Sequence, residues 1–427
     1  MSPSGHQLLN EMTARAGVPS GVHLQVADRC NHACQHCYQI QGRKGEMSTA
    51  EIKALLDELA EAGVVLLNVS GGEATLRPDL LDLLRYARAK GFALRLFTNG
   101  YTMTAALAGE IRRVGVLTVE VSVYSDEAAA HDAVTRVPGS LARTLEGVRH
   151  LVAAGVRVHL KAPATALVPD AFARAKRLAA ALGGGVSVVS SSDITPMEDG
   201  DQASRALAAE PAELLARGAM KPWSPPPDLE AALAEARAEA PCGACRESVT
   251  VLSNGDLRPC TDIVAPLGNV RARRFLDMYR EPGAQMVRAL TWADVHGCRD
   301  CHFLPGCERC HASASHQSGD LLGPYASGCA AMLARYEAAA GPLTVLAPDA
   351  ACEPGRDPRL GPFRIVAPGV VQPAPDVLSA ADEGRRRDFP WVRPARAFLE
   401  AMSYGNEPSA APPAKARRRL PVAGGGP

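Results

Sequence analysis

Between residues 22 and 190, short runs of β-branched residues alternate with amphipathic helical patterns. The predicted strands are Val22–Ala27, Val64–Ser70, Ala93–Thr98, Thr118–Tyr124, Arg157–Lys161 and Val186–Ser190. The predicted helices are Ala50–Ala62, Leu80–Lys90, Ala105–Val114, Leu141–Ala154 and Ala171–Leu182. Strands that alternate with helices form parallel βαβ units. Six units are fewer than the eight of a closed barrel, so we expect an α/β fold with an open, partial (β/α)6 barrel of the TIM type.

Cap residues support these helix boundaries. Polar residues that favour the N-cap precede the helices: Ser48, Asp79, Thr104, Ser140 and Asp170. Glycines stand where C-caps belong: Gly63, Gly91, Gly115 and Gly155.

The helical and strand periodicity stops near residue 200, which predicts a change of domain. We divide the chain into an N-terminal extension (1–20), the barrel (21–200), a linker (201–235) that contains the Pro-rich run Pro222–Pro227, a cysteine-rich domain (236–335) and a tail (336–427). The tail is rich in Pro, Ala and Arg, so we expect most of it to be irregular or disordered, with one short helix at Pro394–Met402. We therefore expect deletion of residues 345–427 to leave the rest of the protein intact.

Charge and hydropathy exclude several classes of protein. The formal net charge is zero, which removes the electrostatic reason to expect nucleic-acid binding. The chain has neither a run of eighteen apolar residues nor an apolar signal segment at its start, so we expect a cytoplasmic protein without membrane association. In that compartment its twelve cysteines are expected to be metal ligands or catalytic groups rather than disulfides.

The first three cysteines have the spacing C-x3-C-x2-C. Cys30, Cys34 and Cys37 follow the first predicted strand, at the barrel face where active sites lie. Three thiolates can hold three irons of a [4Fe–4S] cluster and leave the fourth iron open for a ligand. A zinc loop completed by His32 or His36 is the alternative that spacing alone leaves open.

A C-x3-C-x2-C loop after the first strand of a partial barrel resembles the radical S-adenosylmethionine (SAM) superfamily. The resemblance covers roughly residues 20–200. It implies an enzyme whose open iron binds SAM and whose reduced cluster cleaves it to methionine and a 5′-deoxyadenosyl radical, which takes a hydrogen atom from a substrate. The family often has an aromatic residue before the third cysteine, whereas this chain has His36.

A second motif completes the expected SAM pocket. Ser70-Gly71-Gly72-Glu73 follows the second predicted strand, and glycines let backbone groups approach a ligand closely. The resemblance assigns Gly71, Gly72 and Glu73 to the amino group of SAM. It also implies that Ser122 and Lys161, on the fourth and fifth strands, contact the ribose or carboxylate of SAM.

Eight further cysteines lie between residues 242 and 329. Cys242-x2-Cys245-x14-Cys260 is followed by Cys298-x2-Cys301-x5-Cys307-x2-Cys310 and by Cys329. A pair of zinc ribbons is the alternative interpretation. The pattern resembles the SPASM domain, which carries two auxiliary [4Fe–4S] clusters, although the Cys307–Cys310 gap is one residue shorter than usual.

The resemblance also implies how these thiols are shared. The first auxiliary cluster would use Cys242, Cys245, Cys260 and Cys310, and the second would use Cys298, Cys301, Cys307 and Cys329. Cys352 lies outside both sets, and we expect it to be inert.

The same resemblance predicts a ribosomally made peptide or protein as the substrate, because most SPASM proteins modify peptides. A small cofactor or tetrapyrrole precursor and a non-catalytic, zinc-stapled binding protein remain the alternatives. Only about twenty residues precede the first predicted strand, so we expect any leader recognition to come from a separate protein, and an electron donor such as flavodoxin or ferredoxin to be a partner. Thr261 after Cys260 counts against sulfatase maturation.

No catalytic residue can be assigned from the sequence. We expect substrate contacts from the polar loop 193–200, and the segment 124–140, with His131, Asp132 and Arg136, resembles peptide-maturase relatives.

Overall fold

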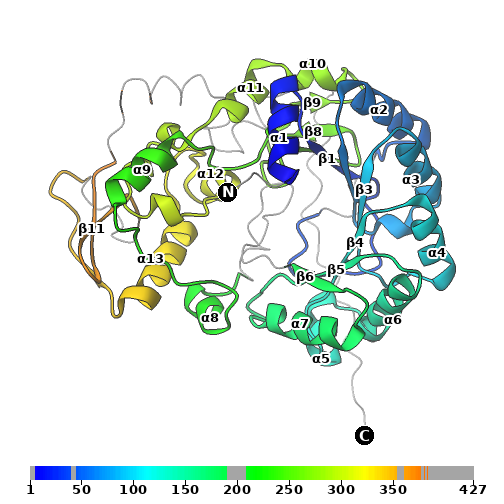
Figure 1. Ribbon diagram of the computed structural model, residues 1–427, viewed down its shortest axis with the longest axis horizontal. Coiled ribbons are helices and arrows are strands. Elements are labelled where there is room, and N and C mark those ends of the chain that lie inside the picture. The colour runs from blue at the N-terminus through cyan, green and yellow to red at the C-terminus, as the bar shows by residue number, and fades with distance from the viewer. Residues whose placement is uncertain are drawn as a thin grey trace, which may run out of the picture.

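The computed structural model describes residues 5–39, 45–189, 208–352 and 360–376, together with Ser379 and Asp382. A curved sheet with helices on its outer side forms the N-terminal half, and a cysteine-rich half with shorter elements lies beside it (Figure 1). Among the described residues, no helix is long and apolar enough to cross a membrane.

Six parallel strands form the predicted partial barrel. They are β1 (Gly21–Gln25), β2 (Leu66–Ser70), β3 (Ala93–Thr98), β4 (Thr118–Ser122), β5 (Val158–Lys161) and β6 (Ser187–Val189). Each strand pairs in parallel with the next one in the chain, as βαβ connections require. The barrel is open, because β6 is an edge of the sheet. The predicted fold class is confirmed.

The predicted helices lie on the outer, convex face of the sheet (Figure 1). They are α2 (Thr49–Ala62), α3 (Leu80–Ala89), α4 (Ala105–Val114), α6 (Ser140–Ala153) and α7 (Ala171–Leu182). Two further helices, α1 (Gly5–Ala16) and α5 (Ala128–Thr135), were not predicted.

Local hydrogen bonds explain where two helices begin, and they correct one predicted cap. Ser48 and Glu51 form a capping box on α2, and the Thr104 hydroxyl accepts from the backbone of α4. Ser140 is not an N-cap, because Gly139 occupies that position before α6. The Ser140 hydroxyl instead donates to Asp132 at 2.8 Å.

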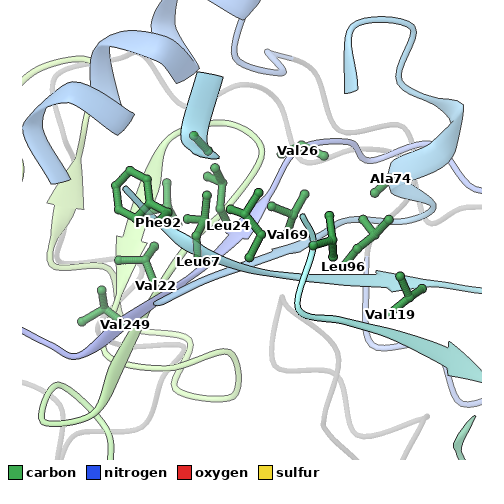
Figure 2. Close-up of a cluster of buried hydrophobic side chains, with 14 of the residues drawn as sticks. Val22, Leu24, Val26, Leu67, Val69, Ala74, Phe92, Leu96, Val119 and Val249 are labelled. Atoms are coloured by element: carbon green, nitrogen blue, oxygen red, sulfur yellow. The ribbon is translucent and has the colours of Figure 1, made fainter. Parts of the chain in front are cut away.

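The core lies between the sheet and its helices. Side chains alternate between the two faces of a strand, so Val22 and Leu24 of β1 point together with Leu67 and Val69 of β2 toward the helices (Figure 2). Each such side chain contributes roughly 1.5–3 kcal/mol when fully buried. The intervening residues face the concave side, where the polar groups of the site are found.

The cysteine-rich region extends the barrel sheet, which the sequence did not predict. Strand β7 (Ser248–Val251) pairs in parallel with β1, and β8 (Asp256–Arg258) and β9 (Gly268–Asn269) continue the sheet in antiparallel order. The two predicted domains therefore share one nine-stranded sheet.

Helices also occur in and after the predicted linker. Helix α8 (Pro211–Ala216) lies inside it, and α9 (Leu229–Ala238) begins near its end, with the Asp228 side chain as its N-cap. The cysteine-rich region itself contains α10 (Phe275–Tyr279), α11 (Pro282–Ala289), α12 (His311–Ser318) and α13 (Ala326–Ala340). Single turns of 3-10 helix complete it: η3 (Trp292–Asp294) and η4 (Leu304–Gly306), with η1 (Ala74–Leu76) in the barrel.

Part of the tail is ordered, contrary to expectation. Strands β10 (Thr344–Val345), β11 (Phe363–Ala367) and β12 (Val370–Pro373) form a separate three-stranded sheet. Phe363 and Val371 are fully buried against Phe303 and Met332 of the cysteine-rich region. The tail alone has too few apolar residues to make a core, but it adds them to a core that the preceding region supplies. The predicted helix Pro394–Met402 lies outside the described residues.

A glycine in α6 sets how closely this helix approaches the end of β3. A Cβ on Gly147 would lie 2.2 Å from the Gly100 carbonyl oxygen, whereas a Cβ on Gly109 of α4 would meet nothing closer than 3.8 Å. We therefore expect Gly147→Ala to lower the free energy of unfolding by about 1–3 kcal/mol through overpacking. Gly109→Ala should raise it by about 0.5–1 kcal/mol through helix propensity. Urea unfolding of both variants measures the difference, and equal effects would contradict the close contact.

Candidate functional site

The loop that follows β1 brings three thiols together. Burial raises the pKa of Cys34 to about 12, and the nearby Cys37 and Cys30 thiols raise it further. Burial likewise raises the pKa of Cys30 to about 11, with the Glu73 carboxylate and Cys37 adding to the effect. The three predicted cluster ligands are therefore electrostatic neighbours of each other, and Cys30 is also a neighbour of Glu73.

The end of α5 holds the backbone of this loop. The amide of Ala33 donates to the Thr135 carbonyl at 3.1 Å, and the amide of Gln35 donates to the Val134 carbonyl at 3.0 Å. Asp132 fixes the start of α6 by accepting from the Gly139 amide at 2.6 Å and the Leu141 amide at 3.0 Å. In this structure the segment that resembles peptide-maturase relatives supports the cysteine loop.

Gly71 and Gly72 lie against the backbone that leads into the cysteine loop. A Cβ on Gly71 would be 2.5 Å from the Ala27 carbonyl oxygen, and one on Gly72 would be 2.5 Å from that of Arg29. The amides of Gly72 and Glu73 donate to these two carbonyls, both at 2.8 Å. Glycine is thus required here for contact with the protein's own chain, a reason that sequence reasoning missed.

The Glu73 carboxylate is buried, with 1% of the residue exposed, and is held on several sides. Its Oε1 accepts from the Thr75 amide at 3.0 Å and from the Thr98 hydroxyl at 2.6 Å. Its Oε2 accepts from the Asn99 amide at 2.6 Å. These bonds connect the turn after β2 to the end of β3 and fix the orientation of the carboxylate.

Asn99, at the end of β3, reaches the cysteine loop. Its Nδ2 donates to Asn31 Oδ1 at 2.7 Å and lies 3.9 Å from Cys30 Sγ. The sequence shows a polar residue at this strand end, but only the fold shows that it contacts the loop.

Tyr124 and His36 cover the second cysteine. The Tyr124 hydroxyl lies 4.0 Å from Cys34 Sγ, and burial raises the pKa of this hydroxyl well above its usual value. The His36 ring packs edge-on against Tyr124, with the ring centroids 4.9 Å apart. Burial lowers the pKa of His36 to about 4, so the ring is neutral. A neutral His36 thus packs as the aromatic residue usual at this position would.

Ser122 and Lys161 are neighbours at the ends of β4 and β5. They are direct partners in the strand register. The Lys161 Nζ lies 4.8 Å from the centre of the Phe97 ring, and the centre of the His23 ring lies 5.5 Å from the centre of the Phe97 ring. Burial lowers the pKa of His23 to about 4, and the Lys161 charge adds to this effect.

Glu120 adds a carboxylate to the same concave face. In the strand register it stands between Phe97 of β3 and His159 of β5. Only 8% of Glu120 is exposed. Sequence reasoning did not select Glu120, although a single carboxylate between valines on a buried strand was the signal that could have found it.

Four thiols of the cysteine-rich region form one group. Burial raises the pKa values of Cys242 and Cys260, and the nearby Cys310 thiol raises both further. Burial also raises the pKa of Cys245 to about 12, with a further contribution from Cys242. The structure therefore places Cys310 near Cys242 and Cys260 despite the shortened gap before it.

The other four thiols line a single small cavity of about 30 Å³, between η4, α13 and the start of β11. Its thiols are Cys298, Cys301, Cys307 and Cys329. Among the described residues, no three His, Cys, Asp or Glu side chains are arranged to hold a single metal ion. Four half-buried thiols that line one cavity fit a cubic iron–sulfur cluster, which takes four cysteine ligands. Cys352 lies apart and contacts the Pro373 carbonyl.

Two family models match the chain over these two thiol-bearing regions. The model described as the radical SAM superfamily matches residues 24–169, and an iron–sulfur cluster-binding domain, SPASM, matches residues 242–302. Residues 24–169 are therefore a radical SAM domain. Residues 242–302 match a domain that is described as iron–sulfur cluster-binding.

Curated relatives of this radical SAM protein have different named activities. The AdoMet-dependent heme synthase of Oleidesulfovibrio alaskensis is 35% identical over 144 residues, which are 33% of this chain and 37% of the relative. The mycofactocin maturase MftC of Mycobacterium tuberculosis is 31% identical over 151 residues, 35% of this chain and 38% of the relative. The match thus spans little more than a third of these relatives.

Solved structures share the fold. The Streptococcus suis protein SuiB, bound to its precursor peptide SuiA, has a TM-score of 0.53 at 14% identity, covering 72% of this chain and 75% of SuiB. The structure of anSMEcpe with bound AdoMet has a TM-score of 0.55 at 13% identity, covering 75% of this chain and 96% of anSMEcpe. The shared architecture of this radical SAM protein therefore extends beyond the barrel.

The hydrogen bonds of Glu73 predict the effect of a nearly isosteric change. In Glu73→Gln, an amide group replaces one acceptor, so a buried donor on Thr98 or Asn99 loses its partner. We expect the free energy of unfolding to fall by about 1–3 kcal/mol. Glu146→Gln, on the exposed side of α6, should change it by no more than about 0.5 kcal/mol. Denaturant unfolding of both variants is the measurement, and equal values would contradict the described role of Glu73.

Proposed function

We propose that this protein cleaves SAM reductively at a [4Fe–4S] cluster held by Cys30, Cys34 and Cys37 and uses the resulting radical to modify a peptide. When bound, such a cluster supplies an electron and an open iron for SAM. The observation that carries the proposal is the group of three half-buried thiols at the carboxyl ends of parallel strands, with Cys30 beside Glu73.

Residues around the thiols would bind and orient SAM. Glu73 is buried and fixed, so its carboxylate would accept from the SAM ammonium without reorganisation. Gly71 and Gly72 would present a close backbone surface beside it. Lys161 and Ser122, paired at the strand ends, would bind the carboxylate or ribose. Asn99 and Tyr124 would donate hydrogen bonds to the cluster thiolates.

The eight SPASM cysteines would hold two auxiliary clusters in the predicted sets. The mutual effects of Cys242, Cys260 and Cys310 on their pKa values support the first set. The cavity lined by Cys298, Cys301, Cys307 and Cys329 supports the second. With all four positions of each cluster taken, these clusters would transfer electrons rather than bind the substrate.

A ribosomally made peptide is the substrate class that we favour. Relatives include the MftC maturase and the PqqA peptide cyclase of Streptomyces rochei. The concave side of the sheet also suits a peptide, because Glu120 and His159 offer polar groups there. We further propose an external electron donor such as flavodoxin or ferredoxin, and a separate leader-recognition protein.

A tetrapyrrole is the second candidate, favoured by the heme synthase relatives. Tetrapyrrole precursors of heme carry carboxylates. The buried Glu120 carboxylate would repel such a negative group if it were placed beside it. This electrostatic argument is the reason for placing the peptide first.

Iron content tests the three proposed clusters. Protein reconstituted without oxygen should hold about twelve irons, because each cube contains four. Replacing Cys30, Cys34 and Cys37 together by Ala should remove about four and leave the rest. Cys352→Ala should remove none, since this thiol lies outside all three groups. Iron and sulfide analysis gives the counts, and stoichiometric zinc with little iron would overturn the proposal.

Chromatographic detection of 5′-deoxyadenosine tests the reaction. Dithionite-reduced protein should release it slowly from SAM, and the variant without Cys30, Cys34 and Cys37 should release none. Addition of the true substrate should accelerate the release, so precursor peptides and iron-coproporphyrin are compared side by side. Acceleration by the porphyrin alone would replace the peptide by the second candidate, and no release with all clusters intact would refute the reaction.

A further inference from the structure

The segment 360–376 follows the last SPASM cysteine by about thirty residues and returns to the second thiol group. We refer to it as the closing segment. It lies outside residues 242–302, which the SPASM model matches. Its position beside the cavity was not expected, because the sequence predicts an irregular tail from residue 336.

Two backbone amides of the closing segment point at thiol sulfurs. The Gly361 amide donates to Cys329 Sγ at 3.3 Å, and the Phe363 amide donates to Cys301 Sγ at 3.3 Å. Both residues also line the cavity that the four thiols surround. Phe363 is 1% exposed and its ring packs at 5.8 Å from that of Phe303.

Hydrogen bonds tie the closing segment to the peptide that bears Cys298 and Cys301. The His302 amide donates to the Phe363 carbonyl at 2.8 Å, and the Ile365 amide donates to His302 Nδ1 at 3.1 Å. This reciprocal pair fixes the Phe363 amide opposite Cys301.

Charged contacts hold the far end of the same region. His296 Nδ1 lies 3.1 Å from the Asp376 carboxylate. The Arg299 guanidinium makes two bonds of 2.9 Å to the two oxygens of Asp382. His296 and Arg299 flank Cys298, so the Asp376 contact attaches the end of the closing segment beside the first thiol of the group, and Asp382, which lies beyond the segment, contacts the other side.

We infer that the closing segment is the outer wall of the second auxiliary cluster, and that the amides of Gly361 and Phe363 set its reduction potential. The inference rests on the proposed assignment of this cluster to Cys298, Cys301, Cys307 and Cys329. Hydrogen bonds to thiolate sulfurs and exclusion of water are two of the factors that determine cluster potentials. An N–H···S bond stabilises the more negative, reduced cluster, so it raises the potential.

Truncation of the chain tests whether the closing segment protects the second auxiliary cluster. A chain ending at Cys352 lacks the closing segment, and a chain ending at Pro390 is the control, since it keeps every described residue. We expect the shorter chain to hold about eight irons instead of about twelve after reconstitution, or to lose about four rapidly to a chelator. This outcome is the opposite of that expected from the sequence for deletion of residues 345–427. An iron content and a chelator resistance equal to those of the control would overturn the inference.

A matched pair at one position tests the hydrogen bond. Gly361→Pro removes the amide proton, whereas Gly361→Ala keeps it. A Cβ at 361 would lie 3.3 Å from the Phe363 ring, which must shift slightly, and 3.6 Å from the Cys329 sulfur. Both changes are made in protein that lacks Cys30, Cys34 and Cys37, so that only auxiliary clusters are titrated. In redox titrations followed by electron paramagnetic resonance, we expect one midpoint potential to fall in Gly361→Pro and to stay unchanged in Gly361→Ala.

A second pair of variants, at position 363, tests the same inference if Gly361→Pro fails to fold. Phe363→Pro should lower the same potential, and Phe363→Leu, which keeps the amide, should not. Unchanged potentials in both Pro variants at full iron content would overturn the hydrogen-bond part of the inference. A wild-type protein with only about eight irons would instead refute the proposed second auxiliary cluster itself. Failure of the proposed function and failure of this inference therefore give different results.

Discussion

The site depends on a backbone contact that leaves no room for a side chain. Two neighbouring strands, β1 and β2, continue past their ends as hydrogen-bonded chains, with the amides of Gly72 and Glu73 donating to the carbonyls of Ala27 and Arg29. Since a Cβ on Gly71 would overlap the Ala27 carbonyl and a Cβ on Gly72 would overlap the Arg29 carbonyl, only glycine at both positions permits the contact. The contact places the Glu73 carboxylate beside Cys30, so one steric constraint determines both the position of the cysteine loop and that of the residue proposed to bind SAM.

Local sequence predicted the barrel well because its signals are local. The bounds of β3, α4 and α7 are those predicted, since each has a clear periodicity and a flanking turn or cap. The pairing of β7 with β1 was missed, because β7 is a four-residue strand whose partner lies more than two hundred residues earlier. The same limit explains the tail, where β11 is stable only against Phe303 and Met332, which no pattern within the tail reveals.

The candidate site divides along similar lines. The grouping of the later thiols was implied by the resemblance to the SPASM domain, because spacing alone left a pair of zinc ribbons open, and it stays a prediction. Asn99, Glu120 and Tyr124 depend on which strands are neighbours and on which face each side chain lies, and those facts belong to the folded sheet. Gly361 and Phe363 act through their amides, and a backbone amide carries no signature in the sequence.

The pairing of β1 with β7 also constrains how the chain is made. The Ser20 hydroxyl and the Gly21 amide both bond the carbonyl of Glu247, and the first of these bonds joins residues 227 positions apart. At roughly 5–20 residues per second, ribosomes need roughly 10–45 s to cover that distance. During this interval β1 has one edge open to other chains, and an unpaired edge strand is a site of aggregation. Strand β7 of the SPASM region thus covers the open edge of β1 only after most of the barrel has been synthesised.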